Sequence, residues 1–249
     1  MFLNKHAKFY IYGYYNNMRI GFNTIKYPAA ALFTACSLGT AAPIAAQTLT
    51  QPADTFELAG KHLINPVDKY TQEDLPAVFR ESVNPSSWTN DPEILKNAPD
   101  PYFTLKGKKT LAKCVVDITN CRLYVYDKMG EAVESFRVAL GAPGTPTKPG
   151  IRKVLAKQVY PYRDCPAGSK RRRHPNDYGP KIAYVNEVDT ITGAMSDKGA
   201  YFHGTRHERA VSSAYRYVTH SCTRGHNRDA LYIINDVLKI GDFFKYVKR

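Results

Sequence analysis

The stretch that decides the fold is Cys114-Val-Val-Asp-Ile-Thr-Asn-Cys-Arg-Leu-Tyr-Val-Tyr126. Both of its ends are rich in β-branched and aromatic residues, which fit the pleated surface of a sheet. Thr119-Asn120 separates the two ends, and short polar residues of this kind favour a turn. The stretch therefore predicts a β-hairpin at the start of a β-rich domain.

The same strand pattern continues toward the C-terminus. Further strands are expected at Glu134–Leu140, Ile182–Val188, Ala200–His203 and Asp242–Val247. One clear helix begins at Asn227, which can cap it, and ends at Gly241. Its apolar face consists of Ala230, Ile233, Ile234 and Val237. Many short strands with one main helix on the C-terminal side predict a mostly-β, sandwich or barrel-like domain over residues 111–249.

Residues 47–110, which precede this domain, have a loop-like and proline-rich composition. Short helices are expected at Gln72–Glu81 and Asp91–Lys96. The second is favoured because Pro92 lies in its first turn and acidic residues lie near its start. We interpret residues 47–110 as an N-terminal extension whose role the sequence does not reveal.

Residues 1–46 have the organisation of a secretory signal peptide. They contain four basic residues and no acidic one, then the apolar run Ala29–Leu38, then small residues up to Ala46. This order predicts cleavage after Ala46. Met18-Arg19 would begin a more ordinary signal, which makes Met18 a candidate start. Cys36 leaves a lipid anchor open as an alternative.

The overall composition is that of a globular protein. The chain has 249 residues, 43% of them hydrophobic, and 35 Lys+Arg against 22 Asp+Glu, a formal net charge of +13. The hydrophobic share excludes a disordered chain, and the absence of a Gly or Pro period excludes a fibrous one. No apolar stretch approaches the roughly 18–20 residues of a membrane-spanning helix, so no such helix is predicted in the mature chain.

Export changes the interpretation of the charge. Without residues 1–46 the formal net charge is +9. A basic protein exported to the periplasm or cell envelope meets anionic wall polymers rather than nucleic acid, so no nucleic-acid partner is expected. The basic run Lys170–His174 is then either a solvated loop or a contact with carboxylates and phosphates, and the sequence leaves both open.

Residues able to do chemistry gather near the C-terminus. They are His203-Gly204-Thr205, Thr219-His-Ser-Cys-Thr-Arg224 and Asn227. The thiolate is the nucleophilic form of cysteine, and nearby cations lower the pKa of a thiol. A histidine that is distant in sequence but adjacent in the fold can accept the thiol proton. Arg224, two residues after Cys222, would lie on the same face of a strand, where it could hold a carboxylate.

This pattern leaves three interpretations open. The first is a cysteine-dependent acyl transferase or hydrolase. The second is a zinc site formed by His203, His220, Cys222 and His226. The third is a cysteine with a structural role only.

Three separated blocks of the chain resemble the L,D-transpeptidase catalytic domain family, the cysteine enzymes that remodel bacterial peptidoglycan. Val115–Tyr126 resembles the family's opening hairpin, and Thr145-Pro-Thr-Lys-Pro-Gly150 after Gly141 resembles its Thr-Pro-rich turn. Thr219–Arg224, which follows His203 after the spacing typical of the family, resembles the catalytic motif. The resemblance covers residues 111 to 248.

The resemblance implies roles for individual residues. Cys222 would be the nucleophile and His203 the general base, oriented by a backbone carbonyl at Gly204 or Thr205. The substrate site would be lined by His220, Ser221, Arg224, Thr205 and Asn227. The expected reaction is attack of Cys222 on the diaminopimelate carbonyl of a donor tetrapeptide stem of peptidoglycan. Release of D-Ala and transfer of the thioester to an acceptor amine would give a 3→3 cross-link, with no metal or organic cofactor. A carbapenem would acylate Cys222.

The chain departs from the family pattern at the motif itself. Ser221 stands where the family usually has glycine, and Gly225-His226 replaces an apolar-then-basic pair. These changes leave the acceptor open: a stem amine, water in an L,D-carboxypeptidase, or a protein side chain in a protein-to-peptidoglycan ligase. A non-catalytic wall-binding or zinc-binding protein is a further alternative.

Beyond residue 46 the chain keeps Cys114, Cys121, Cys165 and Cys222. If Cys222 must stay free, at most one bridge can form among the other three, in a compartment where disulfides persist. The sequence does not name the pair.

Overall fold

The computed structural model describes residues 64–80 and 85–249, all within one compact unit, Thr55–Arg249. The signal peptide expected at residues 1–46, with Met18 and Cys36, lies outside the described residues. No helix in the described part of the chain is both long and apolar enough to cross a membrane.

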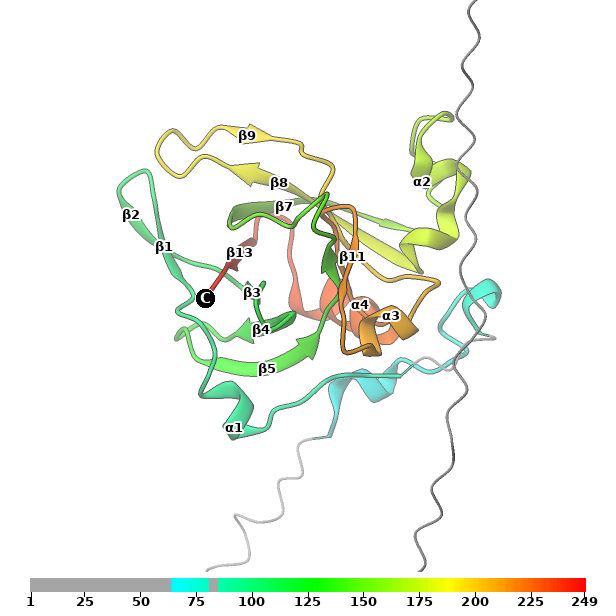
Figure 1. Ribbon diagram of the computed structural model, residues 1–249, viewed down its shortest axis with the longest axis horizontal. Coiled ribbons are helices and arrows are strands. Elements are labelled where there is room, and N and C mark those ends of the chain that lie inside the picture. Colours follow the sequence, from blue (N-terminus) through cyan, green and yellow to red (C-terminus); the bar gives the residue numbers. More distant parts are fainter. Residues whose placement is uncertain (1–63, 81–84) are drawn as a thin grey trace, which may run out of the picture. The chain divides into compact units, whose positions relative to one another are not determined.

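The core of the unit is one large, mostly antiparallel sheet. Its strands lie in the order β12, β10, β8, β7, β13, β3, β4, β5, and β9 pairs with the outer part of β8. Their bounds are β3 Cys114–Asp117, β4 Arg122–Tyr126, β5 Ala132–Arg137, β7 Gly150–Val159, β8 Lys181–Val188, β9 Met195–Ser196, β10 Phe202–His203, β12 Thr223–Arg224 and β13 Phe243–Val247. In Figure 1 the sheet curls into a half-barrel, with β7 and β8 on one side, β4 and β5 on the other, and α4 between them. The expectation of a mostly-β, barrel-like domain is confirmed.

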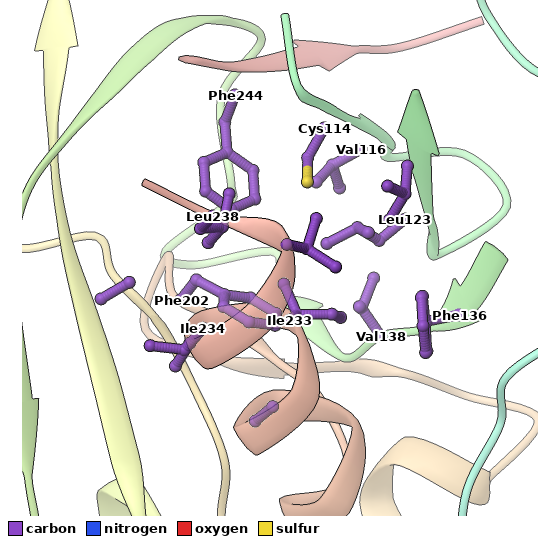
Figure 2. Close-up of a cluster of buried hydrophobic side chains, with 14 of the residues drawn as sticks. Cys114, Val116, Leu123, Phe136, Val138, Phe202, Ile233, Ile234, Leu238 and Phe244 are labelled. Carbon is purple, nitrogen blue, oxygen red and sulfur yellow. The ribbon is translucent and has the colours of Figure 1, made fainter. Parts of the chain in front are cut away.

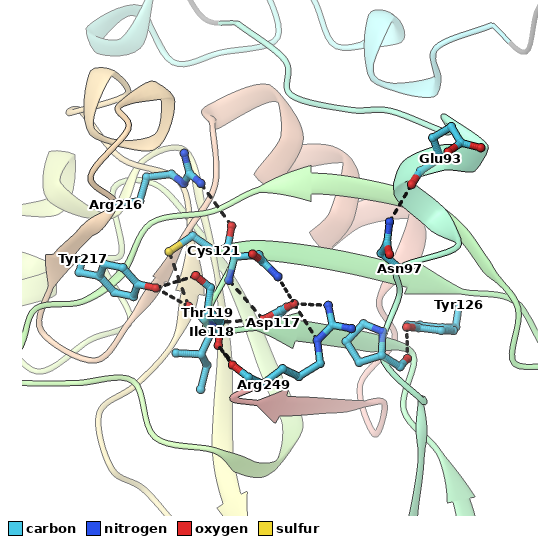
Figure 3. Close-up of polar contacts among 12 residues, drawn as sticks. Glu93, Asn97, Asp117, Ile118, Thr119, Cys121, Tyr126, Arg216, Tyr217 and Arg249 are labelled. Atoms are coloured by element: carbon cyan, nitrogen blue, oxygen red, sulfur yellow. Dashed lines mark hydrogen bonds and ion pairs between the residues drawn. The ribbon is translucent and has the colours of Figure 1, made fainter.

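The predicted hairpin is the pair β3–β4, in which Asp117 lies opposite Arg122. Its turn is wider than Thr119-Asn120 and is organised by the buried Asp117, which accepts hydrogen bonds from the backbone amides of Thr119 and Asn120. Burial would raise the pKa of Asp117, but hydrogen bonds from Arg249 and Asn120 outweigh burial and lower it. Figure 3 shows Arg249 reaching from the C-terminus to this carboxylate. The last residue of the chain thus closes the first hairpin of the sheet.

The predicted main helix is α4, Asn227–Tyr232, which continues as a π-helical turn, Ile233–Val237. Its N-cap residue is His226, not Asn227, and the side chain of His226 makes no capping hydrogen bond. The predicted apolar face is buried: Ile233 lies between Phe202 and Phe244 on one side and Leu123 and Val138 on the other, and Ile234 lies beside Phe202 (Figure 2). The helix therefore fills the hollow of the half-barrel, which positions its N-terminus beside β10 and β12.

Three features were not predicted from the sequence. The ten-residue strand β7 follows the Thr-Pro-rich turn directly. A hairpin of β1 Tyr102–Leu105 and β2 Lys108–Leu111 occupies the end of the predicted extension. A short parallel pair joins β6 Leu140–Gly141 to β11 Tyr217–Thr219.

Short helices accompany the sheet. They are α1 Pro92–Leu95, α2 Lys170–Arg173 and α3 Arg209–Ser212, with 3₁₀ turns at Pro66–Lys69, Ala77–Phe79 and Pro175–Tyr178. α1 forms where the sequence predicted it, with Asp91 accepting from the amide of Glu93. The helix expected at Gln72–Glu81 is reduced to the turn Ala77–Phe79 within the described residues. Because Val67 packs into the main core and Phe79 against Leu231, this upstream segment is part of the same packed unit.

Candidate active site

The parallel pairing of β10 with β12 brings the two halves of the motif together. His203 lies opposite Arg224, and Phe202 lies opposite Thr223. Because side chains alternate along a strand, His203, Arg224 and Cys222 share one face, while Phe202 and Thr223 point into the core. The backbone amide of Thr223 donates to the carbonyl of Tyr201, which extends this register to Cys222. The predicted nucleophile and base are therefore neighbours on adjacent strands.

His203 is fully buried and held in one tautomer. Its Nδ1 lies 2.5 Å from the carbonyl oxygen of Gly204, and because a carbonyl can only accept, Nδ1 carries the proton. Nε2 is buried and has no hydrogen-bond partner among the described residues. Burial and the positive charge of Arg224 lower the pKa of His203 to about 3, against the opposing effect of the Gly204 bond. At neutral pH the ring is uncharged and Nε2 is free to accept a proton.

Cys222 is nearly enclosed, with 8% of its surface exposed. Its Sγ lies 3.7 Å from the carbonyl oxygen of Gly199. Burial raises the pKa of the thiol, while the backbone amide of Tyr201 and the positive charges of Arg224, Arg152 and Lys170 act in the opposite direction. Since the net direction is upward, a base is needed to generate the thiolate at neutral pH.

The turn after His203 is anchored from α4. The backbone amide of Thr205 donates to Oδ1 of Asn227 at 2.8 Å, and the amide of Asn227 donates to Oε1 of Glu208 at 2.6 Å. A Cβ on Gly204 would lie 2.4 Å from Oδ1 of Asn227, so only glycine fits here. The chain Glu208–Asn227–Thr205 thereby fixes the Gly204 carbonyl that orients His203. Thr205 and Asn227 are buried in this network, which favours positioning over direct substrate contact; their predicted substrate role stays a prediction.

Ser221, the departure from glycine at the motif, makes hydrogen bonds that a glycine could not make. Its φ is 69°, in the left-handed region where glycine is strongly favoured. Its hydroxyl donates to the carbonyls of Thr145 and Pro146, each at 3.2 Å. Its own carbonyl accepts from the hydroxyl of Thr147 at 3.1 Å. The serine therefore connects the catalytic loop to the Thr-Pro-rich turn.

Arg224 and His220, both predicted to line the substrate site, differ in placement. Arg224 is half-buried, and its Nε is buried with no hydrogen-bond partner among the described residues. His220 is exposed on the loop between β11 and β12. The structure thus brings Arg224 to His203 and Cys222 and leaves His220 at the rim.

The basic run Lys170–His174, whose role the sequence left open, belongs to a segment that lies over the thiol side of β8 and β10. We call residues 160–180, between β7 and β8, the cap. The ring of Tyr178 in the cap lies 4.9 Å from that of His203. Cys222 packs in one cluster with Tyr162, Cys165 and other tyrosines. The density of tyrosine between residues 160 and 184 was the available sequence signal.

The zinc alternative finds no matching geometry. His226 is buried away from the thiol, with Nε2 3.2 Å from the hydroxyl of Ser212 and Nδ1 3.8 Å from Oε1 of Glu208. Over residues 64–80 and 85–249 no group of three or more His, Cys, Asp or Glu side chains is placed to hold a metal ion. Cys114, Cys121, Cys165 and Cys222 are all free thiols.

Comparison with known proteins gives relatives only at the level of structure and family. No curated protein sequence matches the chain significantly. An L,D-transpeptidase from Stackebrandtia nassauensis is 19% identical, with a TM-score of 0.40 and coverage of 61% of each chain. One from Mycobacterium smegmatis is 22% identical, with a TM-score of 0.37 and coverage of 59% of this chain and 65% of that one. An L,D-transpeptidase in complex with imipenem is 22% identical, with a TM-score of 0.37 and coverage of 56% and 61%. The chain thus spans less than two thirds of the length of these solved chains.

The family comparison covers the same residues as the site. The YkuD family model, described as the L,D-transpeptidase catalytic domain, matches residues 112–242, more than half of the chain. The matched range begins just before β3 and includes β10, β12 and α4. The chain therefore belongs to the L,D-transpeptidase catalytic domain family.

Proposed function

We propose that the protein is a peptidoglycan L,D-transpeptidase that uses Cys222 as its nucleophile. The observation that carries this proposal is the neutral, fully buried His203, whose unpartnered Nε2 lies on the same strand face as the thiol. A buried polar atom without a hydrogen-bond partner lowers the stability of the fold. A role for Nε2 as the general base that accepts the thiol proton accounts for its being kept unpartnered.

The acylation step follows from these positions. Nε2 of His203 takes the proton from Cys222 as Sγ attacks the carbonyl of the diaminopimelate residue in a donor tetrapeptide stem. The positive charge of Arg224 stabilises the developing negative charge. The bond to the terminal D-Ala breaks, the leaving amine takes the proton from His203, and a thioester remains on Cys222. Because the Gly204 carbonyl keeps the proton on Nδ1, the same Nε2 serves as base and then as acid.

Transfer repeats the proton exchange in the other direction. An acceptor amine from a second stem loses its proton to Nε2 of His203, attacks the thioester, and forms a 3→3 cross-link while Cys222 is regenerated. Water as acceptor would instead make the enzyme an L,D-carboxypeptidase, and an amine on a protein would make it a protein-to-wall ligase. We propose the stem amine, because the family match is to the transpeptidase domain.

The proposal includes export to the periplasm or cell envelope, where the substrate lies. It rests on the signal-like order of residues 1–46, which belongs to the sequence alone. Fractionation of cells that produce the tagged chain should find it in the envelope, cleaved after Ala46. A chain that stays in the cytoplasm and is not cleaved near Ala46 would contradict export.

The decisive experiment is incubation of the purified protein with purified tetrapeptide muropeptides, followed by mass analysis. Cross-linked dimers with release of D-Ala are expected. Tripeptides alone would replace the proposal with the carboxypeptidase, and muropeptide–protein adducts would replace it with the ligase. No product of any kind would contradict catalysis altogether.

Inhibitor chemistry provides an independent test of the nucleophile. One solved member of the fold was determined in complex with imipenem, and another as an avibactam carbamoyl enzyme. We expect intact-protein mass to show one carbapenem adduct on this chain that maps to Cys222. An adduct that maps to Cys165 instead would move the nucleophile into the cap.

A further inference from the structure

Arg171 in the cap is held rigidly above the thiol side of the sheet. Its guanidinium carbon lies 4.8 Å from the ring centroid of Tyr184 and 4.9 Å from that of Tyr201. These two rings contact each other edge to face at 4.9 Å. The neighbouring Arg172 anchors the short helix by donating to the carbonyl of Cys165 at 3.2 Å. Arg171 therefore departs from the solvated-loop interpretation of the basic run.

The charge of Arg171 is not compensated by an acidic side chain. Its Nε is buried without a hydrogen-bond partner, and it takes part in no ion pair within the described residues. The nearby carboxylates have other partners: Asp177 pairs with Arg206 at 3.0 Å, and Asp197 accepts from the amide of Gly199 at 2.7 Å. Contact with two aromatic rings fixes the guanidinium, and the Arg171 side chain also hydrogen-bonds to Tyr201. A guanidinium has five N–H donors, so its remaining N–H groups can bind a planar acceptor.

The uncompensated charge shares its aromatic neighbours with the reacting thiol. Tyr201, which stacks on Arg171, packs in the same cluster as Cys222. Burial raises the pKa of Tyr178, and the neighbouring Cys222 raises it further. The positive charges of Arg171 and Arg224 lower the pKa of the same hydroxyl. The thiol itself is acted on by the positive charges of Arg224, Arg152 and, from the cap, Lys170. Arg171 shares Tyr178 and Tyr201 with this site.

We propose that Arg171 binds a free carboxylate of the donor stem peptide on the cap side of Cys222, and so selects donors that carry it. The inference rests on the proposed function and adds a specificity-determining residue to it. A guanidinium with free N–H groups binds carboxylate by paired hydrogen bonds. A tetrapeptide donor offers two such groups, the terminal carboxylate of D-Ala and the free carboxylate of diaminopimelate.

The test compares two proteins, each assayed with three donors. Wild type and Arg171→Gln are assayed for release of D-Ala, or its amide, from the free tetrapeptide, its C-terminal amide and its diaminopimelate amide. With the free donor, Arg171→Gln should lose about 10- to 100-fold in kcat/KM, the range expected for a charge-assisted hydrogen bond. With the donor that lacks the bound carboxylate, wild type and variant should differ by less than about threefold. That donor identifies which of the two carboxylates Arg171 binds.

Matched variants separate recognition from folding. Arg173→Gln removes an exposed charge from the same helix and should change kcat/KM less than about threefold with every donor. Arg171→Lys should recover only part of the loss, because lysine keeps the charge without the planar fork. Alkylation of Cys222 by uncharged iodoacetamide reports whether the thiol environment is intact in each variant.

Two results would overturn the inference. An equal loss in Arg171→Gln with all three donors would show a structural role for the stack. Equal activity of wild type and Arg171→Gln with the free tetrapeptide would show that the carboxylate binds elsewhere. Both differ from failure of the proposed function, in which wild type itself releases no D-Ala from any donor.

Discussion

The strand pair β10–β12 has two buried faces of opposite character. On the core face, Phe202 packs against Phe244, and the hydroxyls of Thr223 and Tyr246 bond to each other at 3.1 Å. On the cap face, Nε2 of His203 and Nε of Arg224 are buried without partners among the described residues. The same two short strands thus carry packed or hydrogen-bonded side chains on one face and polar atoms without hydrogen-bond partners on the other.

This difference separates the side chains that stabilise the fold from the side chains that are available for chemistry, on the same two strands. Burial of apolar or bonded side chains stabilises the fold, whereas an unpartnered buried donor or acceptor costs free energy that only a ligand or a reaction can recover. Substitutions on the core face should therefore change the free energy of unfolding, and substitutions on the cap face should change turnover. Paired measurements of unfolding and turnover in variants of each face test that separation.

Replacement of the nucleophile should have the largest effect. Cys222→Ala should lower D-Ala release by on the order of 10³-fold or more, because no other described thiol lies on that strand face. Its free energy of unfolding should change by only about 1 kcal/mol. Thermal denaturation and a D-Ala assay measure both, with Cys121→Ala as the matched loss of a buried thiol outside the site. Turnover by Cys222→Ala would refute the assignment.

A core-face truncation should show the opposite pattern. Phe244→Ala removes a fully buried ring that packs against Phe202 and the C-terminal helix, so it should cost about 3–5 kcal/mol of unfolding free energy. Urea denaturation monitors this loss. Conditions under which the variant remains folded should preserve carbapenem acylation of Cys222. A loss below about 1 kcal/mol would mean that the core face is not tightly packed.

The buried His203 should make stability depend on pH. Its pKa is about 3 in the fold and near 6.5 in the unfolded chain. Between these values the unfolded state binds a proton that the folded state does not. Stability is therefore lost as pH falls below about 6.5, by up to about 1.4 kcal/mol per pH unit.

Urea denaturation of wild type and His203→Gln at pH 7 and pH 4.5 measures this contribution. The variant should lose less stability on acidification than wild type, since it has no imidazole to charge. Parallel pH profiles for the two proteins would show that His203 is already protonated or solvated in the fold.

Substitutions of Ser221, at the edge of the site, should have the smallest effect on the free energy of unfolding. At φ 69° an alanine keeps the backbone strain and loses the hydroxyl, whereas glycine relieves the strain. Ser221→Gly should therefore be more stable than Ser221→Ala by about 1 kcal/mol in thermal or urea denaturation. Equal stabilities would show that the backbone strain at φ 69° contributes little at this position.

Local patterns predicted much of the fold. The β3–β4 hairpin, β8, β13 and the helix after Asn227 were all expected because each follows from local periodicity and turn residues. Strand β7 was missed because it directly follows a proline-rich turn and carries Arg152, Lys153 and Lys157, which do not resemble a strand pattern. For the cap, the sequence left the role of the basic run Lys170–His174 open, because the ring contacts of this segment are made with residues that are distant along the chain.

The sequence by itself determined the catalytic candidates. Cys222, His203 and Arg224 stand in a spacing whose chemistry is limited by the residue types, and the family match confirms the class of domain.

Only the tertiary structure decided how these groups are charged and what surrounds them. The state of His203 depends on the Gly204 carbonyl, which Asn227 and Glu208 position from beyond the strand. The placement of Arg171 depends on Tyr184 in β8 and on Tyr201 just before β10. Burial, electrostatic fields and ring stacking arise between segments that are distant along the chain. No local pattern encodes them, and the fold alone brings them to one thiol.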